Sequence, residues 1–244
     1  MALLEVDGIT VRFGGLTAVD GAAFEVAAGG VSGLIGPNGA GKTTLFNVIT
    51  GLQPPTEGRV LLDGTDITRR RPHRRARLGV ARTFQRLEVF GSLSARENVL
   101  VALEMRRRWQ RSGGDLRAEA DALLDRVGIL DVADRRVELL PTGTARLVEV
   151  ARALATGPKL LLLDEPSSGL DEAETDGLGR LLRELAASGL GVLLVEHDMP
   201  LVMETCSHIA VLDFGRVIAS GPPAAIRSDP AVQRAYLGDA KSVS

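Results

Sequence analysis

A glycine-rich segment early in the sequence has the residues that bind a chain of phosphates. Residues 36–44 match the pattern G-x-x-x-x-G-K-[ST] and follow a mostly apolar stretch. The glycines allow successive backbone N–H groups to face an anion, and the start of a helix adds partial positive charge. Lys42 would reach the β- and γ-phosphates, and the Thr43 hydroxyl would ligate Mg²⁺. The expected phosphate-binding residues are Gly36, Pro37, Asn38, Gly39, Ala40, Gly41, Lys42, Thr43 and Thr44.

A pair of carboxylates supplies the second half of this chemistry. Asp164 and Glu165 follow the apolar run 160–163, which is typical of a strand buried within a sheet. Asp164 would hold Mg²⁺, directly or through water, and Glu165 would orient or activate the attacking water. Such a pair has little specificity alone, because acidic residues often follow buried strands. Combined with the glycine-rich segment, it predicts hydrolysis of a nucleoside triphosphate.

Alternating strands and helices must place these two segments together. Apolar runs bounded by turn residues predict strands at 3–6, 11–13, 23–26, 31–35, 59–62, 160–163 and 191–195, and a hairpin of 209–212 with 216–218. Helical spacing predicts helices at 42–50, 171–187 and 199–205. This alternation around a glycine-rich loop predicts an α/β domain with a mainly parallel sheet.

The middle third of the chain is predicted to be helical. Ser94 and Glu97 form the pattern of a capping box at the start of one helix. Asp115 can cap a second helix, and either Thr142 or Thr144 can cap a third. We interpret this stretch as an insertion into the α/β domain.

Composition excludes several classes of protein. The 244 residues suit one domain with an inserted subdomain, and the net charge of −2 gives no overall basic field for nucleic acid. Cys206 is the single cysteine, so an internal disulfide is impossible and a reducing compartment is suggested. Apolar runs fall far short of the ~20 residues that span a bilayer, and Glu5 follows the first residues without a basic stretch, which argues against a signal peptide.

Further motifs, in a fixed order along the chain, carry a resemblance to a known family. Gln85 ends Arg-Thr-Phe-Gln, Asp171 ends Ser-Gly-Leu-Asp, and His197 follows the predicted strand 191–195. With the phosphate-binding segment and the carboxylate pair, they make the sequence resemble, nearly end to end, the nucleotide-binding subunits of ATP-binding-cassette (ABC) transporters. The resemblance implies that Phe13 stacks on adenine and that Gln85 and His197 sense the γ-phosphate.

The resemblance also implies a fold and a set of cofactors. The fold is a P-loop NTPase core with a mainly parallel sheet, an N-terminal antiparallel β subdomain and an inserted α-helical subdomain. In a single domain, 1–86 and 157–244 would form the core and 87–156 the insertion. The cofactors would be ATP and Mg²⁺. The implied metal ligands are Thr43, Gln85 and Asp164, and the implied catalytic residues are Glu165, His197, Lys42 and Gln85.

The segment 140–144 stands where the family has its Leu-Ser-Gly-Gly-Gln signature, but only Leu140 and Gly143 match. In the family this segment covers the ATP held by the opposite subunit, so Thr142, Gly143 and Asp171 are expected to contact that nucleotide. Our hypothesis is that Thr142 partly replaces the missing serine hydroxyl. The alternative is a degenerate signature with slow hydrolysis.

Other segments resemble the ATPases of branched-chain amino acid importers, a group in which the signature often reads Leu-Pro-x-Gly. These segments are 79–85, 97–100 together with Phe90, 195–199, 211–218, 226–230 and 235–238. Amide and urea importers belong to the same group, so the solute is open. The resemblance implies a location at the cytoplasmic face of the membrane. It implies as partners a second ABC ATPase, a paralogue or a copy, together with integral membrane permeases and, indirectly, an extracellular or periplasmic solute-binding protein.

Two other functions remain as alternatives. A soluble cassette ATPase acting on DNA or the ribosome would usually carry two cassettes, long coiled coils or zinc cysteines, and we expect no nucleic-acid partner. A regulatory subunit with weak or no hydrolysis would explain the altered signature but not the intact Glu165 and His197.

Two stretches of the chain are rich in arginine, 69–77 and 106–111. We interpret each as a charged face exposed to solvent, and contact with lipid headgroups is the alternative. The segment 86–98 is where the family receives its permease.

Overall fold

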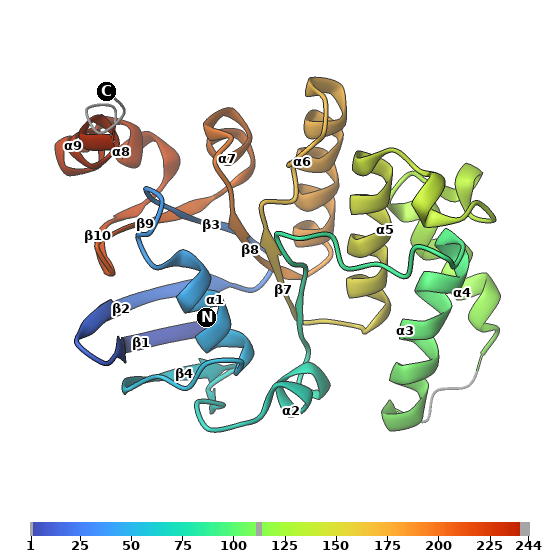
Figure 1. Cartoon of the computed structure of the whole chain (residues 1–244), viewed down its shortest axis with the longest axis horizontal. Helices are drawn as coiled ribbons and strands as arrows, with labels where there is room; N and C mark the ends of the chain where they lie inside the picture. The colour runs from blue at the N-terminus through green and yellow to red at the C-terminus, as the bar shows by residue number, and fades with distance from the viewer. Residues whose placement is uncertain (1, 111–113, 240–244) are drawn as a thin grey trace.

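A computed structural model describes residues 2–110 and 114–239 of the chain (Figure 1). The strands are β1 (Ala2–Phe13), β2 (Leu16–Ala27), β3 (Val31–Ile35), β4 (Glu57–Leu62), β5 (Thr65–Asp66), β6 (Val80–Arg82), β7 (Leu160–Asp164), β8 (Gly191–Val195), β9 (His208–Asp213) and β10 (Arg216–Gly221). The helices are α1 (Lys42–Thr50), α2 (Pro72–Arg77), α3 (Ala95–Gln110), α4 (Leu116–Arg126), α5 (Thr142–Ala155), α6 (Glu172–Ala187), α7 (Met199–Thr205), α8 (Pro223–Ser228) and α9 (Pro230–Asp239), with short 3₁₀ turns η1 (Leu130–Val132) and η2 (Val137–Leu139).

The strands form two sheets. One has six strands in the order β10-β9-β3-β8-β7-β6, in which only the pairing of β10 with β9 is antiparallel. The other has four strands in the order β2-β1-β4-β5, all antiparallel. The predicted α/β class, with a mainly parallel sheet and an antiparallel N-terminal sheet, is confirmed.

Strand β7 shows how the parallel sheet is packed. All five of its residues are buried, as expected for a parallel strand covered on both faces. Side chains alternate between the faces of a strand. Leu160 and Leu162 accordingly belong to a hydrophobic cluster with α1 and the antiparallel sheet, while Leu161 and Leu163 belong to a second cluster with α5, α6 and the helical region. The two layers of core therefore meet across this strand.

Helices α3, α4 and α5 lie together at one end of the molecule, away from the antiparallel sheet (Figure 1). The predicted capping box is present, since Ser94 N donates to Glu97 Oε2 at 2.7 Å and Glu97 N donates to Ser94 Oγ at 3.2 Å. The Asp115 carboxylate accepts from the first N–H groups of α4, as predicted. Arg96 on α3 pairs with Asp121 on α4, which ties these two helices to each other.

Two expectations about element boundaries are wrong. Segments 3–6 and 11–13 are parts of one strand, β1. The pairing of β1 with β2 shifts in register between Val6 and Ile9, where Gly8 adopts φ 61°, and this irregularity does not end the strand. Neither Thr142 nor Thr144 caps α5. Pro141 occupies the N-cap with an extended ψ of 152°, so Thr142 is already the first helical residue, and no side chain caps this helix.

The basic stretch 69–77 is not simply a solvated face. It includes α2, and the side chain of Arg75 points inward with 1% of the residue exposed. Its Nη1 donates to the carbonyls of Val48 and Ile49 at 2.6 and 2.7 Å, and Nη2 donates to Thr68 O at 2.7 Å. Arg75 thereby binds carbonyls of the last turn of α1, where the helix runs out of N–H donors; Val48 O also accepts from Gly51 N at 3.1 Å.

Candidate functional site

The phosphate-binding segment forms a tight loop between β3 and α1. Gly36 and Gly41 have φ angles of 153° and 108°. A Cβ atom would lie 2.0 Å from Leu212 O at Gly36 and 2.6 Å from Ala18 O at Gly41, so both positions require glycine. Lys42 Nζ donates to Gly36 O at 2.6 Å and to Pro37 O at 2.9 Å, which places the ammonium group over the loop.

The loop and four other segments line a hollow of about 240 Å³. Its lining includes most of the residues selected from the sequence, although they come from distant parts of the chain. These lining residues are Asn38, Gly39, Ala40, Gly41, Lys42, Thr43, Thr44, Gln85, Glu165 and His197, with Ala18 and Val195. The backbone N–H groups and the lysine therefore face the same space as the carboxylate predicted to act on water.

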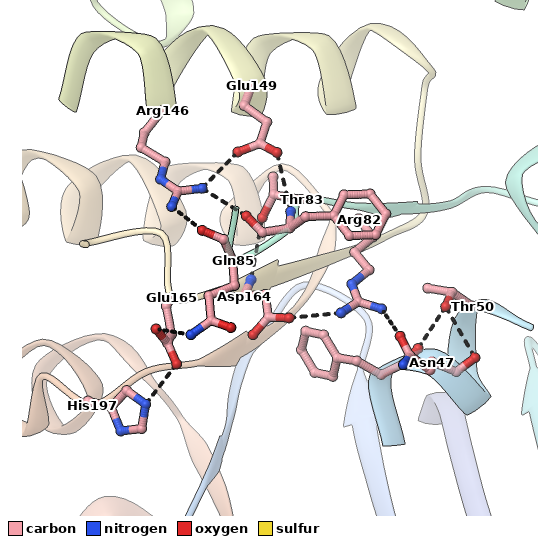
Figure 2. Close-up of polar contacts among 12 residues, drawn as sticks. Asn47, Thr50, Arg82, Thr83, Gln85, Arg146, Glu149, Asp164, Glu165 and His197 are labelled. Carbon is pink, nitrogen blue, oxygen red and sulfur yellow. Dashed lines mark hydrogen bonds and ion pairs between the residues drawn. The ribbon is translucent and has the colours of Figure 1, made fainter. Parts of the chain in front are cut away.

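Glu165 is held from two sides (Figure 2). Gln85 Nε2 donates to its Oε2 at 3.0 Å, and His197 Nε2 lies 2.7 Å from its Oε1. The Glu165 backbone has φ 51°, a left-handed conformation that is unfavourable for a residue other than glycine, and its N–H donates to Val195 O at 2.8 Å. Strained backbone of this kind concentrates at functional sites, which fits a carboxylate placed for chemistry.

Asp164 directly precedes Glu165 in the chain and has a partner that sequence reasoning missed. Its Oδ2 accepts from Arg82 at 2.8 Å, and Arg82 also donates to Asn47 Oδ1 on α1 at 2.6 Å (Figure 2). The guanidinium lies 5.3 Å from the Phe46 ring centroid and 4.8 Å from that of Phe84. Arg82 thus links the strand that carries Asp164 to the helix that follows the phosphate loop.

Helix α5 fixes the main chain at Gln85, and this contact too was absent from the sequence interpretation. Arg146 Nη1 donates to Phe84 O at 2.8 Å and to Glu149 Oε2 at 3.2 Å, and Nη2 donates to Gln85 O. Phe84 N donates to Glu149 Oε1 at 3.2 Å. Helical spacing could have placed Arg146 and Glu149 on one side of α5, but not the segment that they contact.

Seven of the predicted nucleotide contacts, all within the part of the chain described, do not line the hollow. Gly36, Pro37 and Asp164 directly precede lining residues in the chain, whereas the other four lie in different segments. Phe13 ends β1 with 48% of the residue exposed, so it is not a core residue. Gly143 is buried against α6 and Thr142 is exposed. Asp171 caps α6 by accepting from Glu174 N at 2.8 Å. One chain therefore does not place the segment 140–144 over its own phosphate loop.

The predicted metal ligands offer a hydroxyl, an amide oxygen and one carboxylate. Thr43 and Gln85 line the hollow, whereas the carboxylate of Asp164, which is 4% exposed, is ion-paired with Arg82. No group of three or more His, Cys, Asp or Glu side chains gathers as a metal site within residues 2–110 and 114–239. Hard oxygen donors with a single carboxylate suit Mg²⁺ that is held jointly with phosphates, so the residues fit this ion.

A separate apolar groove of about 430 Å³ lies between α2, α3 and α5. Its lining includes Phe84, Phe90, Met105, Trp109 and Arg152. Phe90 is 44% exposed, and its ring centroid lies 4.7 Å from the Arg152 guanidinium. Within the segment 86–98, where the resemblance places the permease contact, Glu88 and Phe90 line the groove, whereas Leu87 and Val89 pack against the core.

None of the described helices is long and apolar enough to cross a membrane.

Comparisons with known proteins agree with this geometry. The family model for the ABC transporter matches residues 19–168, and the model for the branched-chain amino acid ATP-binding cassette transporter matches residues 216–242. The chain is 43% identical to the high-affinity branched-chain amino acid transport ATP-binding protein BraF of Pseudomonas aeruginosa and 41% identical to the corresponding protein LivG of Escherichia coli K12. Each alignment covers 98% of both chains.

Solved structures show the same similarity. A nucleotide-free ATP-binding cassette from an ABC transporter superimposes with a TM-score of 0.87 and 32% identity, covering 97% of this chain and 99% of that chain. A dimeric cassette in a post-hydrolysis state, bound to ADP and Pi, superimposes with a TM-score of 0.80 and 26% identity, covering 90% of this chain and 98% of the other. With its phosphate loop, its paired carboxylates and these matches, the chain belongs to the ABC transporter family and is one of its ATP-binding cassettes.

Proposed function

We propose that this chain hydrolyses ATP to drive the uptake of branched-chain amino acids, or chemically related solutes, through a membrane permease. The observation that carries the proposal is the hollow in which Glu165 lies between Gln85 and His197, opposite the phosphate loop. The solute assignment rests on the names of the relatives and on the family match at 216–242. The amide and urea importers remain the nearest alternative.

The residues of the hollow would divide the reaction between them. The loop N–H groups and Lys42 would bind the β- and γ-phosphates, which develop charge as the bond to the leaving group breaks. Glu165 would orient the attacking water and accept its proton, and His197 and Gln85 would hold this carboxylate in place. Mg²⁺ held by Thr43, Gln85 and Asp164 would neutralise phosphate charge.

A complete site would need two cassettes arranged head to tail. This proposal is supported by the position of Thr142 and Gly143 outside their own chain's hollow and by the dimeric cassette among the similar structures. Because no side chain caps α5, N–H groups at its start are available to an anion held by the facing subunit. Phe13 would contact the adenine and Asp171 the subunit interface. The family resemblance favours a paralogue as the second ATPase over a copy of this chain.

The apolar groove would receive a cytoplasmic segment of the permease, and the chain would lie at the cytoplasmic face of the membrane. Exposed Phe90 and the groove that it lines support this proposal, because apolar side chains exposed side by side at a surface often mark an interface. An extracellular or periplasmic solute-binding protein would deliver solute to the permease without touching this chain. We further propose 87–156 as the inserted helical subdomain, with 1–86 and 157–244 as the core.

Purification of the full chain from membranes tests the proposal. We expect permease subunits to accompany it, and uptake of radiolabelled leucine into vesicles to require ATP and this chain. Glu165→Gln should retain ATP binding but lower hydrolysis and uptake by at least about 100-fold, because the water would lose its base. Recovery of ribosomes or DNA instead of permeases would favour a soluble cassette. Unchanged uptake with Glu165→Gln would favour a regulatory subunit.

A further inference from the structure

The contacts of α5 with the Gln85 segment are directed at the main chain. Arg146 donates to the carbonyls of Phe84 and Gln85, and Glu149 accepts from the Phe84 N–H. These contacts hold three successive peptide units, the two on either side of Phe84 and the one that follows Gln85, and so restrict where the main chain of Gln85 can lie. The Gln85 side chain, by contrast, is exposed and extends toward Glu165 (Figure 2).

The two side chains that make these contacts are themselves fixed. Arg146 and Glu149 have 8% and 6% of their side chains exposed and form an ion pair at 3.2 Å. Burial raises the pKa of Glu149, although the N–H of Phe84 and the charge of Arg146 act in the opposite direction. Removing two charges from water costs about as much as their attraction returns, so a buried pair is a poor source of stability but holds its neighbours in one geometry.

The Gln85 amide depends on this geometry for its contact with the catalytic carboxylate. Its Nε2 lies 3.0 Å from Glu165 Oε2, and a shift of about 1 Å in the main chain of Gln85 would break that hydrogen bond. We propose that Arg146 is a positioning residue for ATP hydrolysis, which holds the Gln85 amide against Glu165 through the carbonyls of Phe84 and Gln85. The inference rests on the ATPase activity within the proposed function and not on the identity of the solute.

The location of Arg146 adds a consequence for the assembled pair of cassettes. It lies one turn into α5, the helix that begins at Thr142 in the segment expected to face the partner's nucleotide. Since a helix moves as a rigid element, displacement of its first turn would be passed by Arg146 to Gln85. Binding of the partner's nucleotide at the start of α5 would therefore change how the Gln85 amide holds Glu165 in the same chain.

Steady-state hydrolysis by the assembled complex tests this role. Arg146→Lys keeps a positive charge opposite Glu149, but an ammonium group cannot match the fork geometry of the guanidinium at two carbonyls and a carboxylate. We expect kcat to fall by about 10-fold to 100-fold, because small displacements of a positioned group have effects of this size, while the KM for ATP stays within about twofold. Arg107→Lys, at an exposed arginine on α3, is the matched control and should leave both constants unchanged.

The same change in a Gln85→Ala background separates positioning from general damage. If Arg146 acts through Gln85, Arg146→Lys should cause no further loss of kcat once the amide is gone. An equal fold loss in both backgrounds, an unchanged kcat in the single variant, or a rise in KM without a fall in kcat would each overturn the inference. Failure of leucine uptake alongside normal ATP turnover in the unaltered complex would refute the proposed solute, and it would not affect this comparison.

Discussion

Arg75 is a single side chain that closes the end of one helix and joins it to another segment. Besides the carbonyls of Val48, Ile49 and Thr68, it contacts that of Arg70 through Nε at 2.9 Å. Burial lowers its pKa to about 10, so the guanidinium stays charged at neutral pH and its donors remain complete. Its neighbour Arg74 is exposed.

Arg75→Met should therefore destabilise the protein strongly. The change leaves several buried carbonyls without a donor, and we expect a loss of about 2–4 kcal/mol in the free energy of unfolding, measured by urea denaturation. Arg74→Met is the control and should change the free energy by less than about 0.5 kcal/mol. Equal effects of the two variants would show that Arg75 is not the residue that closes α1.

Thr142 carries the hydroxyl that we expect to replace, in part, the serine hydroxyl missing from the signature segment 140–144. Its exposure leaves the hydroxyl accessible to a facing subunit. We expect Thr142→Ala to lower the ATPase rate of the assembled complex by about 10-fold, the equivalent of one hydrogen bond to a charged group. Thr144→Ala serves as the neighbouring control. An unchanged turnover in Thr142→Ala would leave the signature without a working hydroxyl at this position.

At the scale of single elements, α6 offers a comparison of two glycines in one helix. A Cβ atom at Gly177 would meet no heavy atom closer than Arg180 Nη2 at 3.7 Å. At Gly179 it would lie 3.0 Å from Thr205 Oγ1 and 3.1 Å from Leu201 Cδ1, because α7 packs closely against α6 there. The two positions thus share backbone conformation but differ in available space.

Gly177→Ala should stabilise the chain by about 0.5–1 kcal/mol, because alanine loses less backbone entropy than glycine when the helix forms. Gly179→Ala should lack this gain, since the crowding against α7 offsets it. Thermal unfolding of the two variants beside the unaltered chain measures the difference. A higher Tm for Gly179→Ala than for Gly177→Ala would contradict the packing described for these helices.

The elements around the phosphate loop were predictable because local sequence determines them. Strand 31–35, helix 42–50 and strand 191–195 have the predicted bounds, since apolar runs end there at glycines or polar turn residues. By contrast, α2 and the short β6 were not predicted. Arginines dominate α2, and its inward face is visible only through the main-chain carbonyls that Arg75 meets.

The same distinction applies to the candidate site. Sequence motifs identified Lys42, Glu165 and His197 as site residues, and the parallel sheet brings all three to the lining of one hollow. The contacts of Arg82 with Asp164 and of Arg146 with Gln85 join residues more than sixty positions apart. No local pattern specifies such a pairing, because it depends on how the helices settle on the sheet.

At the scale of the whole molecule, the apolar groove is separate from the nucleotide hollow, but the segment 84–85 and helix α5 contribute to both. Phe84 lines the groove and precedes Gln85, which lines the hollow. Arg152 on α5 donates to Glu88 O, so the helix that positions Gln85 also supports the wall of the groove. A permease segment seated in the groove would therefore contact the elements that hold the site.

Phe90→Asp should separate ATP binding, which is retained, from permease binding and solute uptake, which are lost. A charge in the groove would disfavour an apolar permease segment, so we expect loss of permease co-purification and at least about a 10-fold fall in solute uptake. ATP binding by the chain should be retained. Leu130→Asp, at an exposed apolar residue on η1, is the control for adding charge to the surface. Normal co-purification of Phe90→Asp would exclude the groove as the docking site.

The strand β7 ends in Asp164, which Glu165 follows, and its side chains are anchored alternately in the two hydrophobic clusters. Loosening either layer would therefore disturb the position of both acidic groups. Both hydrophobic clusters therefore support the hydrolytic centre through this one strand. Heat inactivation and global unfolding should accordingly follow one cooperative curve.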